Sequence, residues 1–527
     1  MKKIFTFLLF TISFNISAQI GITKSGGYAL YSNSTGDYNS AFGIHALRLN
    51  TSGSFNTASG SRSLQFNRIG VGNTAIGYNS LRNNLASNNT ATGAGSLYSN
   101  TTGVKNIAFG AQSLYSNTTG TENTATGSFS LYSNTTGSYN TATGYESLHL
   151  NTTGSNNTAS GRRSLRNNTT GAGNIAFGYQ SLYSNTTGNQ NTATGTGSLY
   201  SNTTGNYNSA NGTGSLYSNT TGKQNTATGW RALESNTTGN YNNATGSGSL
   251  RFNTTGSENN SFGDYSLYLN TTGSQNTAVG SESLGRNTTG RNNNATGNKA
   301  LKFNTTGDYN VATGSSSLYS NTTGTKNVAI GNISLYSNTT GSFNTAFGYN
   351  AQASAVDSSN QTVIGYNATG QADDSVVLGN ADVTAVYMAQ DSGAIVYAAG
   401  LNIGGTEITA TADEINLLDD LTATTQELNY LSGATSSVQT QLDSKQAAIS
   451  GAATTIVSDD LTQSRVLTSN ESGKVTASSV STTELDYLSG VTSSVQTQLD
   501  SKQAAISGAA TTIVSDDLTQ SRVLTSN

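Results

Sequence analysis

The sequence contains no cysteine and no proline, and charged residues make up only 10% of its 527 positions. Without cysteine, disulfide bonds, thiolate metal sites and thiol catalysis are excluded. The absence of proline suits long stacks of strands, because each proline removes one hydrogen-bond donor from a ladder. Leu, Ile, Val and Phe are also sparse, so we expect a thin core spread along a repeat array and not one globular core.

The chain also has few residues of the types that form catalytic or metal-binding sites. It contains two histidines, His45 and His149, which lie far apart in the sequence, and we expect both to be solvated surface residues. No His-Glu-x-x-His motif, phosphate-binding loop or nucleophile elbow occurs in the context that such motifs require. We therefore predict a protein that is not an enzyme and that uses no cofactor or metal.

The charges are scattered along the chain. The formal net charge is −4, with 17 basic and 13 acidic residues in 19–400, and 5 basic and 15 acidic residues in 401–527. Nucleic-acid binding would require basic residues gathered on one face. DNA and RNA are therefore not expected partners.

The N-terminus has the pattern of a secretory signal peptide. Lys2 and Lys3 precede the apolar stretch Ile4–Phe14, and Ile16–Ala18 forms a plausible cleavage site. Residues 1–18 are predicted to be removed, and no later apolar run approaches the length of a membrane span. The expected location is outside the cell or on a bacterial cell surface, associated with the outer membrane.

The dominant feature of the sequence is a 17-residue repeat, anchored on the unit Asn-x-Ala-x-Gly as in Asn106–Gly110. Its glycines fall at Gly43, Gly60, Gly77 and Gly93, then every 17 residues to Gly365, and finally at Gly379. They define 21 coils, the last two of which are more apolar and are expected to form a transition or cap. A repeat of this kind predicts an all-β parallel β-solenoid, or β-roll, of roughly 100 Å in length.

Within a coil the order is Asn-x-Ala-x-Gly, two variable residues, Ser-Leu-Tyr-Ser or a relative, Asn-Thr-Thr-Gly, and two more variable residues. This order predicts strand, turn, strand and turn, with Ala and Leu pointing inward. The predicted core ladder includes Ala108, Ala125, Ala142, Leu114, Leu131, Leu148 and Leu182. Coil corners are predicted at Asn117 and Gly120 and at Asn134 and Gly137, where glycine tolerates positive φ and asparagine bonds to nearby backbone. Stacked asparagines can also bond along the array.

A recurring tyrosine is predicted to face outward in many coils. It occurs at Tyr98, Tyr115, Tyr132, Tyr183, Tyr200, Tyr217, Tyr319 and Tyr336. Association of several chains along their length would cover these rings. An exposed tyrosine face on a monomer is the alternative.

The segments Asn-Thr-Ala-Ile-Gly (73–77), Asn-Val-Ala-Ile-Gly (327–331) and Ser-Val-Val-Leu-Gly (375–379) resemble the coils of the YadA-like head of trimeric autotransporter adhesins. The resemblance covers about 28–382. It implies a left-handed β-roll head, here assigned to 19–382, three copies of which associate into a homotrimer. It also implies attachment of cells to host matrix or other surfaces.

The C-terminal part has a different pattern. Residues 410–418 and 424–433 resemble segments of phage-type tail fibres, and residues 383–430 are expected to form a neck or connector. Residues 431–470 return 57 residues later as 488–527, so 431–527 are predicted to be a duplicated stalk that stops inside its second copy, as in a truncated sequence. Val438, Leu442 and Ile449 have the spacing of a coiled-coil seam; a short helix is the alternative.

These observations predict a non-enzymatic, secreted or cell-surface trimeric adhesin or fibre that makes multivalent contacts with an unknown receptor. A tail-fibre-like spacer that displays another domain is the alternative. Outward Thr-Ala-Thr segments, as in Thr141–Thr143, also suggest an ice-binding solenoid, although residues such as Phe109 and Phe177 interrupt the threonine array.

Overall fold

In the computed structural model the described residues are 20–387, 401–403, 406–409, 424–430, 437–453, 465–469 and 475–481, with a few single residues as far as 503. The predicted signal peptide, 1–18, and most of the second stalk copy, 488–527, lie outside the described residues. The chain divides into two compact units, Met1–Asp382 and Val383–Asn527.

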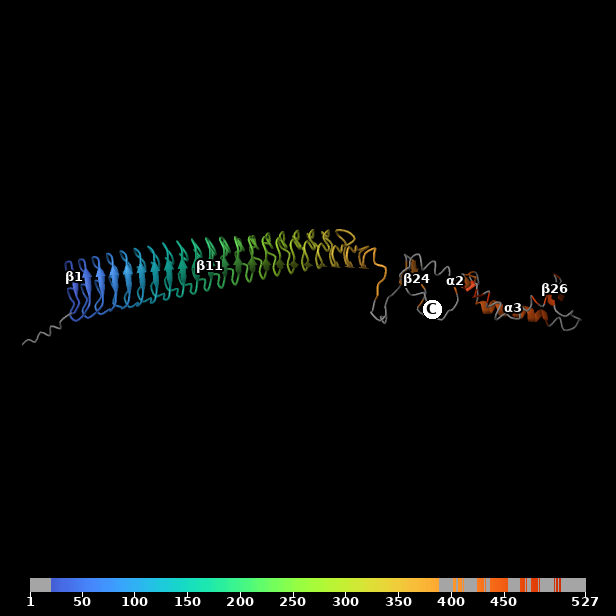
Figure 1. Ribbon diagram of the computed structural model, residues 1–527, viewed down its shortest axis with the longest axis horizontal. Helices are drawn as coiled ribbons and strands as arrows, with labels where there is room; N and C mark the ends of the chain where they lie inside the picture. The colour runs from blue at the N-terminus through green and yellow to red at the C-terminus, as the bar shows by residue number, and fades with distance from the viewer. Residues whose placement is uncertain are drawn as a thin grey trace, which may run out of the picture. The chain divides into compact units, whose positions relative to one another are not determined.

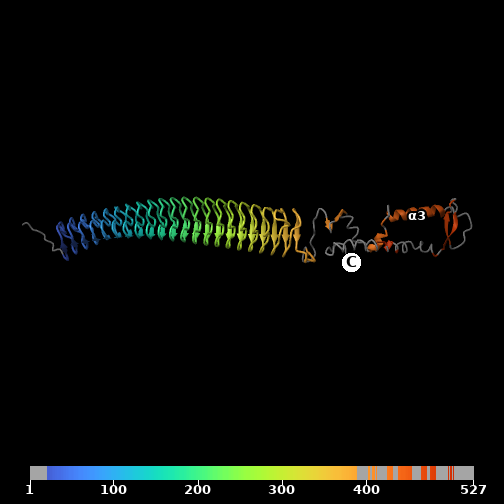
Figure 2. The ribbon, with the colours of Figure 1, turned by 90° about the horizontal axis from the view of Figure 1, so that it is seen from above.

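The first unit is a parallel β-solenoid built on a single 22-stranded sheet, which runs as one file of coils in Figure 1. Figure 2 shows the same file from above, with one strand contributed by each coil. Each strand is three residues long and pairs in register with the strand of the next coil, so that Ala108 lies opposite Ala125. The strands of this sheet are β1 (Thr23–Ser25), β2 (Ser40–Phe42), β3 (Thr57–Ser59), β4 (Thr74–Ile76), β5 (Thr90–Thr92), β6 (Ile107–Phe109), β7 (Thr124–Thr126), β8 (Thr141–Thr143), β9 (Thr158–Ser160), β10 (Ile175–Phe177), β11 (Thr192–Thr194), β12 (Ser209–Asn211), β13 (Thr226–Thr228), β14 (Asn243–Thr245), β15 (Asn260–Phe262), β16 (Thr277–Val279), β17 (Asn294–Thr296), β18 (Val311–Thr313), β19 (Val328–Ile330), β20 (Thr345–Phe347), β21 (Thr362–Ile364) and β22 (Val376–Leu378).

The strands are short because a glycine with positive φ follows them in coil after coil, for example Gly110 at +128°. A Cβ atom on Gly110 would lie 2.6 Å from the carbonyl carbon of Gly127 in the next coil. Both the conformation and the close approach of neighbouring coils therefore require glycine at this position.

The core is a double ladder of alanine and leucine along the solenoid axis. The seven residues predicted to form it, Ala108, Ala125, Ala142, Leu114, Leu131, Leu148 and Leu182, are all fully buried. Each coil contributes little apolar area, so the core is thin but continuous. Such a core depends on stacking, because a single coil could not bury these side chains alone.

The prediction of a second strand in each coil is wrong. Residues 111–116 form a turn, and both Gln112 (φ +54°) and Leu114 (φ +50°) adopt the left-handed conformation. Hydrogen bonds still join this segment to the next coil, since Leu114 N–H donates to the carbonyl oxygen of Ser130 at 2.9 Å. Alternation of side chains predicts a strand only where φ is negative, and the two left-handed residues bend the backbone while leucine still points inward.

The second unit contains short elements, which are described by themselves. β23 (Leu401–Ile403) pairs with β24 (Thr406–Ile408), and β25 (Arg465–Ser469) pairs with β26 (Val475–Ser481), both antiparallel. The helices are α2 (Thr425–Asn429) and α3 (Val438–Ala453). Glu427 accepts a hydrogen bond from the backbone N–H of Thr424 at 2.6 Å, as in a capping box that starts α2. Among the described residues, no helix is long and apolar enough to span a membrane.

Candidate functional site

The corner asparagines form a buried ladder along the solenoid. Nδ2 of Asn117 donates to Oδ1 of Asn100 at 2.8 Å and to the carbonyl oxygen of Gly120 at 3.0 Å. Asn134 makes the same bonds to Asn117 and Gly137, at 2.7 and 2.9 Å. Each asparagine thus closes its own corner and joins it to the preceding coil. Because these side chains are fully buried, the repeated Asn-Thr-Thr segments have a structural explanation.

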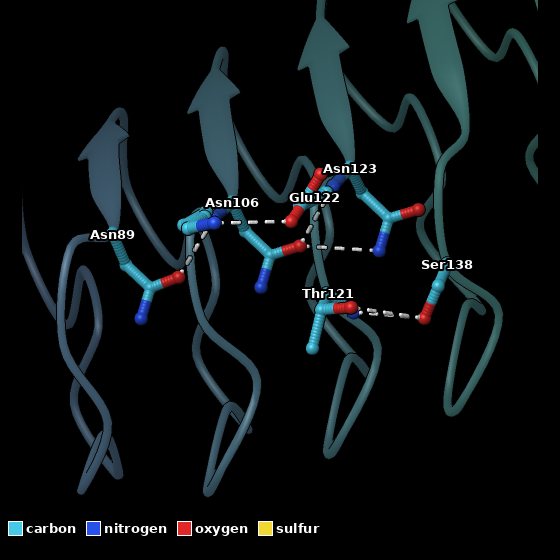
Figure 3. Close-up of polar contacts among 7 residues, drawn as sticks. Asn89, Asn106, Thr121, Glu122, Asn123 and Ser138 are labelled. Carbon is cyan, nitrogen blue, oxygen red and sulfur yellow. Dashed lines mark hydrogen bonds and ion pairs between the residues drawn. The ribbon is translucent and has the colours of Figure 1, made fainter.

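A second ladder is formed by the asparagine that directly precedes the strand in β2 to β20. The backbone N–H and Nδ2 of Asn123 both donate to Oδ1 of Asn106, at 3.0 and 3.1 Å, and Figure 3 shows these contacts. Nδ2 of Asn123 also donates to the carbonyl oxygen of Gly137 at 2.9 Å. Asn123 therefore bonds to the preceding coil and to the corner of its own coil, and its Oδ1 accepts from the backbone N–H of Asn140 in the following coil at 3.0 Å. The sequence marks this asparagine as part of the repeat but does not show what it bonds to.

Positive φ was predicted to be the reason for glycine in Asn-Thr-Thr-Gly, and this prediction is wrong. Gly120 and Gly137 are not among the residues with positive φ. A Cβ atom on Gly120 would instead lie 2.3 Å from the carbonyl oxygen of Gly137 and 2.4 Å from Oδ1 of Asn117. Glycine is required at this corner because two coils and the asparagine amide meet there, not because of its backbone conformation.

A third row of hydrogen bonds involves a position that looks variable in the sequence, directly after the corner glycine. The N–H of Thr121 donates to Oγ of Ser138 at 3.0 Å, as Figure 3 also shows. Equivalent bonds run from Ala172 N–H to Asn189 Oδ1 at 2.8 Å and from Arg291 N–H to Asp308 Oδ1 at 2.7 Å. Short side chains with an acceptor oxygen are thus favoured here, so only part of the sequence variation is free to serve binding.

The tyrosines form ladders of their own. The rings of Tyr98, Tyr115, Tyr132 and His149 stack in succession, with centroids 5.0 to 5.2 Å apart and nearly parallel planes. Burial raises the pKa of Tyr115, and the neighbouring Tyr98 and Tyr132 raise it further. Since the ring faces cover one another, the tyrosines do not by themselves require a second chain to cover them.

The two histidines are half-buried, which corrects the expectation that both are solvated. His45 stacks on Tyr28 with centroids 5.3 Å apart. Nδ1 of His149 lies 3.0 Å from the carbonyl oxygen of Phe129. Neither belongs to a cluster of metal-ligating side chains, because no group of three or more His, Cys, Asp or Glu residues suited to a metal ion occurs in the described part of the chain.

Charged side chains gather at a few points on the turn side of the coils. Nε of both Arg163 and Arg166 lies 2.9 Å from Oε2 of Glu146. Burial tends to raise the pKa of Glu146, but hydrogen bonds from Arg166, Tyr145 and Arg163 outweigh it and lower the pKa to about 2. This carboxylate is therefore held ionised by its neighbours and is unsuited to donate or accept protons near neutral pH.

The outward face of the sheet carries the residues on either side of the central alanine. Over most of its length these residues are a mixture of threonine, serine, asparagine and single apolar residues such as Phe109 and Phe177. Near the C-terminal end, the third residue of each strand is apolar in four successive coils: Ile330, Phe347, Ile364 and Leu378. All four are exposed, Phe347 by 55%. These four residues, called here the apolar strip Ile330–Leu378, form the most apolar part of the sheet face.

The predicted coiled-coil seam falls on helix α3. Among the helix residues whose side chains are described, Val438 and Leu442 are half-buried; Ile449 lies within the helix with its side chain outside the described residues. The described part of the chain shows a short helix, which was the alternative, and its pairing into a coiled coil stays a prediction.

The solenoid offers an extended surface with repeated rows of side chains. Comparison with protein-family models finds none that matches this chain. Comparison with curated proteins finds no significant match either.

Proposed function

We propose that the chain is a non-enzymatic fibre protein, secreted or held on the bacterial surface at the outer membrane, that attaches to cells or surfaces through many weak contacts along the solenoid. The observation that carries this proposal is the difference in burial between the repeated and the variable residues of a coil. Repeated residues such as Asn117 and Leu114 are buried, whereas residues that differ between coils, such as Glu122, are exposed. Many weak contacts on one rigid rod give high total affinity without a pocket.

Attachment can be tested with the purified mature chain on immobilised matrix proteins, cells and glycans. The expected result is binding that weakens strongly when the number of coils is reduced, because avidity depends on the number of simultaneous contacts. Binding only to the part after Asp382, or no binding at all, would favour the alternative of a spacer that displays another domain.

The resemblance to YadA-like heads supports a homotrimer as the working unit. The apolar strip Ile330–Leu378 supports it too, because exposed apolar patches of this kind commonly mark protein interfaces. The substitution Phe347→Asp, in the middle of the strip, should convert a trimer into monomers. Thr119→Asp, at an exposed corner position, is the matched control and should leave the mass unchanged. A monomeric mass for the unsubstituted chain, measured by light scattering, would refute the trimer.

Ice binding remains a lesser proposal, supported by the outward threonines of strands such as β8. Phe109 and Phe177 are each 44% exposed within the same face and break the regular array of hydroxyl and methyl groups. Thermal hysteresis of a fragment spanning 89–348 measures this property directly. Freezing behaviour equal to that of an inert protein at high concentration would end the idea.

A further inference from the structure

The first strand of the solenoid differs from all the others at its centre. β1 reads Thr23-Lys24-Ser25, and Lys24 stands in register with Ala41 of β2. In every later strand of the sheet the central residue is alanine, serine or valine. Lys24 is exposed, whereas Ala41 is fully buried. A charged residue thus occupies the inward position of the coil at one end of the stack.

Among the described residues, β1 pairs only with β2, so its other edge has no partner strand there. Gly43 N–H donates to the carbonyl oxygen of Ser25 at 2.7 Å, and His45 N–H donates to that of Gly27 at 2.9 Å. The equivalent donors of the first coil belong to Gly26 and Tyr28. The described residues begin at Ile20, and they contain no earlier coil to accept these bonds.

The apolar core is nevertheless almost closed at this end. Ala29 and Leu30 of the first coil are 5% and 4% exposed. Ile22, which takes the place of the ladder asparagine, packs partly buried against the core. What the end offers to another molecule is therefore chiefly an edge of backbone donors and acceptors, which is the kind of surface that pairs with an identical edge.

We propose that Lys24 prevents the first strand from pairing with the first strand of a second copy of the chain. Two β1 edges related by a two-fold axis would pair antiparallel with Lys24 opposite Lys24, extending the sheet from one rod into the other. The two ammonium groups would then be brought together between coils, where later coils hold a buried alanine. Desolvation and repulsion of the like charges oppose this pairing, and a charged residue at an inward register position is one way in which proteins protect an edge strand.

The substitution Lys24→Ala tests the proposal, because it makes β1 read Thr-Ala-Ser, the sequence of β3 and β9. The mature chain and its variant are compared by light scattering and by electron microscopy of single particles. The expected result is a two-fold increase in particle mass and a doubled solenoid length for Lys24→Ala. Lys24→Arg, which keeps the charge, and Lys105→Ala, which removes an exposed lysine from the side of a coil, should both match the unsubstituted chain.

A second variant keeps the test valid if Lys24→Ala fails to fold. Lys24→Ser copies the residue found at the same place in β15, where Ser261 is buried in the stack. If both variants keep the β-sheet circular dichroism of the parent and also keep its mass, Lys24 has no such role. Association that widens the particles without lengthening them, or that occurs equally in Lys105→Ala, would likewise overturn the proposal.

Discussion

Oδ1 of Asn106 accepts two hydrogen bonds from one residue of the next coil, the backbone N–H of Asn123 at 3.0 Å and its side-chain Nδ2 at 3.1 Å. The arrangement repeats one coil later, where Oδ1 of Asn123 accepts from the backbone N–H and Nδ2 of Asn140 at 3.0 and 3.1 Å. Each coil therefore completes the polar interior of the coil that follows it, and the fold propagates by identical steps.

Asn123→Ala should weaken the solenoid locally. The change leaves the buried N–H of Asn140 and the carbonyl oxygen of Gly137 without the partners that Asn123 provides. Each unsatisfied buried group costs about 1–3 kcal/mol. We expect the amide protons of 140–143 to exchange with solvent about 100-fold faster, which corresponds to about 3 kcal/mol. Hydrogen exchange followed by mass spectrometry measures this, and Thr119→Ala in the preceding coil, at an exposed position, should leave the exchange unchanged.

Gly120→Ala should disrupt its coil although the backbone conformation of Gly120 suits any residue. The added methyl group would lie 2.3 Å from the carbonyl oxygen of Gly137, so the two coils must separate. We expect a lower temperature of unfolding by circular dichroism. Gly27→Ala is the matched control, because a methyl group added there would have no heavy atom within 4 Å beyond its chain neighbours. Equal unfolding temperatures for the two variants would contradict the steric explanation.

Leu114→Ala should create a cavity in the core ladder between the coils of Leu97 and Leu131. The Leu114 side chain is fully buried, and replacement of a buried leucine by alanine costs about 2–5 kcal/mol. Limited proteolysis should detect the loss as a new cleavage region around residue 114. Leu114→Met, which nearly conserves volume, costs less than about 1.5 kcal/mol and should resist the protease as the parent does. Cleavage of both variants at the same rate would argue against the cavity.

The Glu146 cluster should make stability depend on pH in acid. Its pKa of about 2 in the folded chain lies below its ordinary value of 4.5, so the ionised carboxylate stabilises the fold. That contribution is fully present above pH 4.5 and is lost as the pH falls towards 2. We therefore expect the unfolding temperature of the parent to fall more steeply across this range than that of Glu146→Gln. Glu122→Gln, at a more exposed carboxylate that pairs with Lys105, should keep the slope of the parent; identical slopes for all three chains would contradict the prediction.

Much of the solenoid could be predicted from the spacing of residues. The recurrence of Ala108 and Leu114 at fixed intervals indicated buried ladders, since only core positions of a repeat need the same apolar residue in every coil. The first coil does not match this pattern, because Ile22 and Lys24 occupy the positions that asparagine and alanine hold in later coils. A motif search cannot find a coil whose end position demands different residues.

The repeat, the parallel stacking and the identity of the core follow from the order of the amino acids, because each depends only on which residues recur. The folded chain adds that the leucine segment is a turn in which Gln112 and Leu114 are left-handed. It also shows that the next coil leaves no room for a side chain at Gly120, and that Asn123 bonds to the coil before it and to the coil after it. These features depend on contacts between coils about 4.8 Å apart. Periodicity shows that such contacts exist, but the stacked coils are needed to show which atoms make them.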